Sequence, residues 1–301
     1  MQNKRNKAKL KSSIGSIVFD ILNYCLMLLL CIIMLYPVLY VVFASFSNPD
    51  KFVAHTGVLL APVGFTLKAY ENVLSNPYII SGYKNTIIIV VVGVSINLFM
   101  TALGAYTLSR PKLEFRRPIM LIIMFTMYFS GGMIPAYFNV QELGLMDTIW
   151  ALILPGAIST MNLIIMRTSF ESIPASLEES ARIDGANEFI ILWRIIIPLS
   201  RAVFAVMALY YGVGHWNSWF SASIYIKDRS RYPLQLILRE ILVKDQATEM
   251  MSTSDVNDQF INLRETIKYA TIVVATVPIL CVYPFIQKYF TKGVMIGAIK
   301  G

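Results

Sequence analysis

Apolar runs long enough to cross a lipid bilayer constrain this sequence more than any other feature. The first runs from about Ile17 to Phe46, and five others follow it. They lie at about Asn85–Leu108, Pro118–Tyr137, Thr148–Thr168, Ala202–Ile224 and Tyr269–Phe290. A helix needs roughly 20 apolar residues to cross the hydrocarbon core of a membrane, and 56% of this chain is hydrophobic. The sequence therefore predicts an all-α integral membrane protein with six transmembrane helices.

The distribution of Lys and Arg predicts how these helices are oriented. Residues 1–14 form a basic tail, and the run after it is too long for a cleavable signal peptide. Placing that tail in the cytoplasm puts the basic turn at 110–117 on the same side, and leaves the loop Asn139–Asp147, which has no Lys or Arg, outside. We expect a six-span domain over 15–290, outer loops at about 47–84 and 225–268, an inner loop at about 170–200, and a cytoplasmic tail at 291–301. Both termini then face the cytoplasm.

The segment from Ser176 to Pro198 is the least hydrophobic long interruption in the second half of the chain. Ser176 and Glu179 have the spacing of a capping box, which predicts a helix start. Gly185 suits the left-handed residue that ends a helix, so a second helix should begin after it. Glu178 and Glu179 both stand within reach of Arg182. The segment should form a compact, charged helix–turn–helix.

The same segment carries a spaced motif. Glu179, Ser180, Ala181, Gly185, Ile195, Ile197 and Pro198 match, with conservative departures at Ser180 and Ile197, the pattern Glu-Ala-Ala, three residues, Gly, nine residues, Ile-x-Leu-Pro. The chain thereby resembles the membrane-spanning subunits of binding-protein-dependent ABC importers. The resemblance implies the type I importer permease fold, with a cytoplasmic coupling helix seated in an ATPase subunit. The coupling residues would be Glu178, Glu179, Ala181, Arg182, Asp184, Gly185 and Pro198. The alternative is an ordinary amphipathic loop between helices.

Other segments resemble the carbohydrate permeases of the maltose-type superfamily, in particular the branch for uronic-acid oligosaccharides such as aldouronates or alginate fragments. These segments are Gly131–Pro135, Leu143–Leu145 with Thr148–Ala151, Leu154–Gly156, Asn162–Arg167 and Gln287–Gly301. The resemblance implies an ATP-driven importer in the bacterial inner membrane. Its partners would be a second homologous permease, two ATPase subunits, an extracellular solute-binding protein docking on about Lys227–Lys268, and an oligosaccharide.

Two further expectations concern the tail and the nucleotide. Three glycines make residues 291–301 a poor helix by themselves, and the resemblance implies that Met295, Ile296 and Ile299 contact the ATPase subunits. The chain has no phosphate-loop motif. We therefore expect no cofactor on this chain, with ATP and magnesium bound by the partner ATPase.

The residues that could meet a substrate lie near the end of the fifth apolar run. Trp216, Asn217 and Trp219 offer aromatic faces and an amide, which bind sugar rings by stacking and directional hydrogen bonds. An interfacial aromatic belt would look the same. His215, Asn162 and Tyr128 complete the predicted set of substrate-pathway candidates.

Composition argues against several other functions. The basic residues are dispersed among loops, which disfavours nucleic-acid binding, and no metal-spaced Cys/His cluster occurs. An ATP-independent secondary carrier or channel is the main alternative, although no charged residue falls in the middle third of any predicted span. A membrane protease would have to use His215, and we expect a transport subunit rather than an enzyme.

Overall fold

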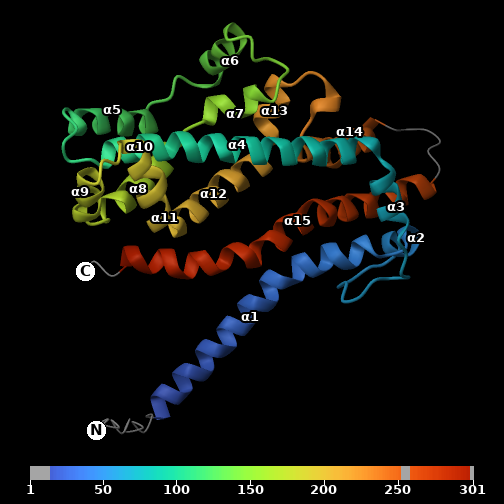
Figure 1. The fold of residues 1–301 in the computed structure, drawn as a ribbon. Coiled ribbons are helices and arrows are strands. Elements are labelled where there is room, and N and C mark those ends of the chain that lie inside the picture. Colours follow the sequence, from blue (N-terminus) through green and yellow to red (C-terminus); the bar gives the residue numbers. More distant parts are fainter. Residues whose placement is uncertain (1–13, 252–257, 299–301) are drawn as a thin grey trace. The chain divides into compact units, whose positions relative to one another are not determined.

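The computed structural model describes residues 14–251 and 258–298, except for the side chains of 244–251, 258–261 and 285–298. The described chain is helical, with elements labelled in Figure 1. Their bounds are α1 Ile14–Ser45, α2 Pro49–Val53, α3 Lys68–Ser75, α4 Pro77–Ser109, α5 Arg116–Tyr128, α6 Met133–Glu142, α7 Trp150–Ile153, α8 Thr160–Glu171, α9 Ala175–Ile183, α10 Glu188–Ile191, α11 Ile197–Leu199, α12 Arg201–Trp216, α13 Trp219–Tyr225, α14 Leu234–Met251 and α15 Asp258–Ala298. Short 3₁₀ turns follow α7 and precede α14, and one π-helical turn, Leu192–Ile196, joins α10 to α11.

The chain divides into two compact units. One unit comprises Met1–Tyr70 and Asp255–Val273. In it, the apolar helix α1 contains Pro37. Aromatic rings of Tyr40, Phe52 and Tyr269 pack edge to face, with centroids 5.6 to 6.3 Å apart. Aromatic edges and faces attract one another, so this cluster links the end of α1 to α15 within the unit.

The second unit, Glu71–Ser254 with Val274–Gly301, is organised around α4. Helices α8 and α12 pack along α4 and α14 packs near its start (Figure 1). One core cluster gathers around Met166, Phe170, Ile191 and Met207, all fully buried. A second cluster forms around Ile89 and Ile153. The small residues that the sequence places along the second span, Gly93 among them, are what let these helices approach α4 closely.

The structure corrects three of the predicted spans, which are broken rather than continuous. Predicted span three is α5 and α6, bent by 112°, because Gly132 between them takes a positive φ of 87°. Predicted span four bends by 53° between Gly156 and Thr160, where Pro155 supplies no amide donor to continue a helix. Predicted span five ends as α12 at Trp216, and α13 starts afresh at Trp219.

The described residues contain three helices that are long and apolar enough to cross a membrane, α1, α4 and Asn262–Pro284. Three bent pairs bring the number to six if each pair counts as one span. The third bent pair joins Glu188–Leu199 to α12, at 86°. The predicted number of six therefore agrees with this reading of the helices, whereas the boundaries of the fifth span do not.

Three predicted loop or tail regions are more helical than expected. The outer loop at 47–84 contains the helix α3, and α4 already begins at Pro77, capped by Asn76. The outer loop at 225–268 contains the whole of α14 and the start of α15. Helix α15 continues to Ala298, so the tail is not irregular up to that residue. Extending an existing helix avoids the unfavourable nucleation step, which propensity within the tail does not reveal.

Candidate functional site

The segment after α8 folds into an elbow, which we define as α9, its turn and α10. Helix α9 ends at Ile183, and Gly185 has φ of 83°. The amide of Gly185 donates to the carbonyl of Arg182 at 3.1 Å and that of Ala186 to the carbonyl of Ala181 at 2.9 Å. These are the two hydrogen bonds of a Schellman motif. The predicted helix–turn–helix is confirmed.

The predicted capping box, in contrast, is wrong. The N-cap of α9 is Pro174, with φ −57° and ψ 128°, and it has no side-chain capping bond. Proline at this position fixes φ and places the entry into the helix directly after itself, so Ser176 already lies inside the first turn. Glu179 then has no capping role and is exposed. The second helix has the side-chain cap instead: Asn187 Oδ1 accepts from the amide of Ile190 at 2.9 Å.

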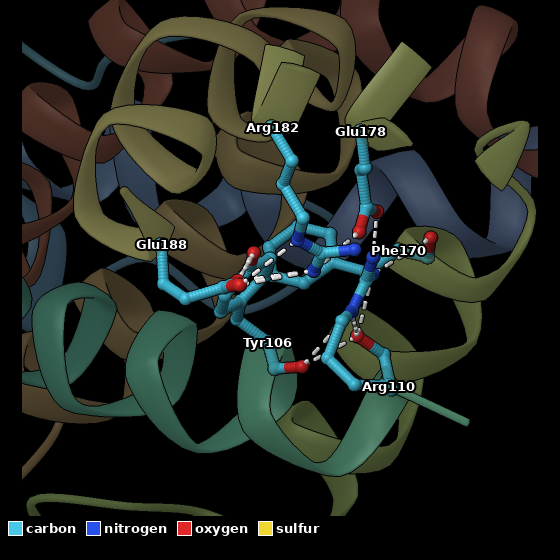
Figure 2. A network of polar contacts seen from close by, with 7 residues as sticks. Tyr106, Arg110, Phe170, Glu178, Arg182 and Glu188 are labelled. Atoms are coloured by element: carbon cyan, nitrogen blue, oxygen red, sulfur yellow. Dashed lines mark hydrogen bonds and ion pairs between the residues drawn. The ribbon is translucent and has the colours of Figure 1, made fainter. Parts of the chain in front are cut away.

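A network of ionic contacts ties the elbow to the end of α4 (Figure 2). Glu178 is 4% exposed and forms an ion pair with Arg110, the residue after α4. Arg182 lies 3.6 Å from the other oxygen of Glu178 and 3.0 Å from Glu188. The hydroxyl of Tyr106, on α4, donates to Glu188 at 2.5 Å. The elbow is therefore fastened to α4 from both of its helices.

The charges in this network compensate one another. Burying a carboxylate is costly unless it is paired and hydrogen-bonded, and Glu178 faces two guanidinium groups. Arg110 in turn stacks over the Tyr106 ring at 4.7 Å and donates to Ser109 Oγ at 2.8 Å. The hydrogen bond with Glu188 raises the pKa of Arg182. Burial lowers the pKa of Arg110, but an arginine guanidinium titrates so far above neutral pH that both side chains stay charged.

Sequence reasoning found part of this network. The predicted contact between Glu178 and Arg182 is present, whereas Glu179 faces outward. Tyr106, Arg110 and Glu188 were missed, because partners 68 to 82 residues distant cannot be inferred from spacing along one helix. Arg110 was visible only as part of a basic turn.

The outer surface of the elbow is apolar and open. Ile183 is 87% exposed, Phe189 64% and Leu177 44%. Asp184 is exposed beside them, and Ala181 lies inward against the core. Pro198 lies at the other end, within the short helix α11 that starts at Ile197 and precedes the 86° bend. An exposed apolar surface rimmed by charge is typical of a protein-binding site.

A second polar cluster lies at the break between α7 and α8. The side-chain amide of Asn97, fully buried on α4, donates to the carbonyls of Gly156 at 2.8 Å and Ala157 at 2.9 Å. His215 Nε2 lies 2.7 Å from Asn97 Oδ1. Asn97 thereby satisfies carbonyl groups that the broken helix leaves without a partner.

A cavity of 680 Å³ opens beside this cluster. Its polar lining comes from Ser159, Asn162, Tyr210, Tyr211, His215 and Ser218. Two of these, Asn162 and His215, were predicted substrate-pathway candidates, and the structure brings them to one cavity. Asn97, which holds the site together, was missed because a lone Asn in an apolar run gives no indication of its partners.

The other predicted substrate residues lie outside this lining. Trp216 packs edge to face against Tyr83, and Asn217 donates to the carbonyl of Val213. The ring of Trp219 carries the guanidinium of Arg239 at 4.0 Å. Tyr128 is 79% exposed at the end of α5. The structure therefore does not gather the aromatic residues into one site with Asn162.

The predicted tail contacts cannot be placed. Met295 and Ile296 lie on α15 where the side chains are outside the described residues, and Ile299 lies beyond them. Residues 252–257 of the predicted docking loop are likewise outside the described part of the chain.

Comparison with known proteins identifies permease proteins of transport systems as relatives of this chain. Residues 117–296 match the family model "Binding-protein-dependent transport system inner membrane component". The polygalacturonan/rhamnogalacturonan transport system permease protein YtcP of Bacillus subtilis is 42% identical, over 94% of this chain and 99% of that protein. The galactooligosaccharides transport system permease protein GanQ of the same species is 27% identical, over 93% and 95%.

A solved structure extends the likeness to the fold. A chain of a bacterial ABC transporter involved in the import of the acidic polysaccharide alginate is 36% identical and superimposes with a TM-score of 0.84. The match covers 93% of this chain and 99% of that one.

Proposed function

This chain belongs to the family of inner-membrane components of binding-protein-dependent transport systems, and from that premise we propose that it forms half of the pathway by which an oligosaccharide enters the cell. It is a permease subunit of an ABC importer with the type I fold, not an enzyme and not an ATP-independent carrier or channel. A solute-binding protein is its partner by the definition of the family.

The proposed substrate is an oligosaccharide, including the uronic-acid class. Relatives over nearly the whole chain are named for polygalacturonan or rhamnogalacturonan, for galactooligosaccharides and for the acidic polysaccharide alginate. Two of these three carry carboxylate groups on their rings. The substrate delivered by the binding protein would belong to this chemical range.

The observation that carries the proposed mechanism is the fastening of the elbow to α4. An ATPase subunit would seat the exposed surface of Leu177, Ile183 and Phe189, while Glu179 and Asp184 contact it at the rim. Movement of the elbow would pass through Glu178 and Arg110 into α4, because a paired buried carboxylate cannot be separated from its partners cheaply. Helix α4 also carries Asn97, so the same rigid element reaches the cavity.

The remaining partners complete the proposal. A second homologous permease would supply the other half of the pathway, and two ATPase subunits would bind ATP and magnesium. The elbow and both termini would face the cytoplasm, and α13, α14 and their connections would face the binding protein. His215 and Asn162 would be the residues of this chain nearest to the substrate.

Reconstitution tests the proposal directly. The complex would be purified from its host through a tag on this chain, reconstituted into liposomes with the binding protein, and supplied with radiolabelled digalacturonate, dimannuronate, galactobiose or maltose. ATP-dependent uptake of at least one sugar is expected, together with copurified ATPase and second permease. Uptake that needs no nucleotide, or a tagged chain that is isolated alone, would contradict the proposed assembly.

A further inference from the structure

The cavity beside the α7–α8 break has the properties of a ligand site. Its volume of 680 Å³ falls within the range of about 300–1,000 Å³ typical of small-molecule pockets. In the described part of the chain its lining contains no Asp, Glu, Lys or Arg. Its polar groups are two hydroxyl-bearing serines, two tyrosines, an amide and an imidazole. Such a lining matches neutral hydroxyl groups rather than a carboxylate, which would need a cation.

Hydrogen bonds around Asn97 determine which ring nitrogen of His215 carries a proton. Because the Asn97 amide nitrogen donates to two carbonyls, its Oδ1 must face His215 and accept. His215 Nε2 therefore carries a proton and acts as the donor. In the neutral ring this leaves Nδ1 as an acceptor. His215 therefore donates to Asn97 through Nε2, and its Nδ1 stays available as a hydrogen-bond acceptor.

Asn162 is the residue that lacks a partner. It lies at the start of α8, is 6% exposed, and lines the cavity. Its backbone amide is capped by Ser159 Oγ at 3.5 Å. No hydrogen bond joins its side-chain amide to any residue of the described chain. A side-chain amide that lines a cavity and makes no hydrogen bond within the described chain keeps its donor and its acceptor available to a group that enters the cavity.

We propose that this cavity is a subsite for one uncharged sugar face, in which the Asn162 amide binds ring hydroxyl groups during transport. The proposal rests on the function proposed above and deepens it, because it assigns hydroxyl recognition to this chain. Carboxylates of an acidic substrate would then be matched elsewhere in the complex. An amide offers both a donor and an acceptor, which is the complement of two adjacent hydroxyls. The Tyr210 and Tyr211 rings and Leu152 supply apolar wall to the same cavity.

Two substitutions at one position separate recognition from structure. Asn162→Leu removes both hydrogen-bonding groups while keeping the number of side-chain heavy atoms, and Asn162→Asp keeps the shape but introduces a carboxylate. The matched control is Thr168→Val on the same helix, where an exposed hydroxyl only donates to the carbonyl of Ile164. ATP-driven uptake of the four disaccharides above would be measured in liposomes, beside the melting temperature of each complex.

For whichever sugar the wild type imports, Asn162→Leu should lower uptake about tenfold, the effect of one hydrogen bond left unmade. Asn162→Asp should lower uptake of an acidic disaccharide further than Asn162→Leu does, and uptake of a neutral one less. Thr168→Val should leave uptake unchanged.

Other outcomes overturn the inference. If both variants take up sugar as fast as the wild type, Asn162 does not bind the substrate and the proposed subsite is wrong. An equal loss in both variants for every sugar, with a lowered melting temperature, assigns Asn162 a structural role. If the wild-type complex imports none of the four sugars although its ATPase responds to ATP, the proposed substrate class fails first, and the subsite fails with it.

Discussion

At the scale of single residues, two glycines have physical reasons to be glycine. Gly185 has a positive φ with no atom within 4 Å of where a Cβ would stand. Gly93 has an ordinary φ, but a Cβ there would lie 2.5 Å from His215 Nε2. The first position is limited by the backbone and the second by packing, so they should respond differently to the same substitution.

Gly185→Ala should weaken coupling, because a left-handed non-glycine residue costs roughly 1–2 kcal/mol and the elbow turn would relax to avoid it. Gly185→Asn is the matched variant, since Asn tolerates this conformation. Binding-protein-stimulated ATP hydrolysis measures both. Gly185→Ala should lose most of the stimulation and Gly185→Asn should retain it. If Gly185→Ala shows the same stimulation of ATP hydrolysis as the wild type, the conformation of this turn does not affect coupling.

Gly93→Ala should destabilise the protein by about 1–3 kcal/mol, since the added methyl overpacks the contact and displaces His215 from Asn97. Gly212→Ala on α12 is the control, because its Cβ would meet only Val94 Cγ2 at an ordinary 3.8 Å. Thermal unfolding in detergent should give a lower midpoint than the wild type for Gly93→Ala, and an equal or higher midpoint for Gly212→Ala. Equal midpoints would contradict the packing argument.

At the scale of elements, adjacent acidic residues on α9 have different environments. Glu178 points to α4 and is paired, whereas Glu179 is exposed. Helical geometry turns neighbouring side chains by 100°, so one faces the protein and the other faces outward. We therefore expect Glu178 to hold the elbow on α4 and Glu179 to be available to a docked partner.

Glu178→Gln should lower the melting temperature, because it leaves Arg110 and Arg182 without their shared carboxylate, and breaking a buried pair costs up to about 3–5 kcal/mol. Glu179→Gln should leave the free energy of unfolding unchanged within about 0.5 kcal/mol, and with it the melting temperature. Reversing the charge with Glu179→Lys should reduce the amount of ATPase that copurifies. If Glu179→Lys retains the ATPase fully, Glu179 does not lie at the docking surface.

The connection between α6 and α7 supplies a pH-dependent element. Asp147 has φ of 57°, and its carboxylate accepts from the backbone amides of Lys227 and Asp228, both at 3.0 Å. These two bonds, with Arg231 nearby, lower the pKa of Asp147. A carboxyl with a lowered folded-state pKa stabilises the fold above its unfolded value of about 4, and this contribution disappears as the pH falls through the folded pKa.

Wild-type protein should therefore lose the attachment between this connection and residues 227–228 as the pH falls through the folded-state pKa of Asp147, which lies below the ordinary value of about 4. Asp147→Asn should remove that pH dependence, because an amide oxygen still accepts from backbone donors and Asn tolerates a positive φ. Hydrogen exchange at the amides of Lys227 and Asp228, measured from pH 7 to pH 3, reads the attachment directly. Parallel pH profiles in the two proteins would contradict the assignment.

At the scale of the whole molecule, α4 connects the two sites. Its end carries Tyr106 and Arg110 contacts with the elbow, and its middle carries Asn97 at the cavity. A straight helix transmits displacement along its axis, so the two sites share one mechanical element. The continuous helix α15 likewise extends the last span to Ala298.

Removing Val294–Gly301 should leave the protein in the membrane and assembled, because the removed residues follow the last apolar window, Asn262–Pro284. The basal ATPase rate of the complex should change if the end of α15 contacts the ATPase subunits, as the family resemblance implies. The rate and the subunit ratio of the purified complex check this. An unchanged rate in a fully assembled complex would make the tail a solvated end.

The sequence by itself determined the features that depend on local chemistry. Membrane helices follow from continuous apolar runs, and the elbow follows from Gly185, whose positive φ needs no distant partner. The spaced motif around it sufficed to identify the family. The bends within the spans were not predicted, because Gly132 and Pro155 permit a break without requiring one.

Tertiary structure alone decided which polar groups meet. Asn97 and His215 lie 118 positions apart, and Tyr106 and Glu188 lie 82 apart. No periodicity relates such pairs. Burial makes these hydrogen bonds necessary, because a polar group that is shielded from water needs a partner within the protein. The packing of α4, α8 and α12 decides which partner is within reach. The same packing left the Asn162 amide facing a cavity, a property that depends on what surrounds the residue and not on its neighbours in the chain.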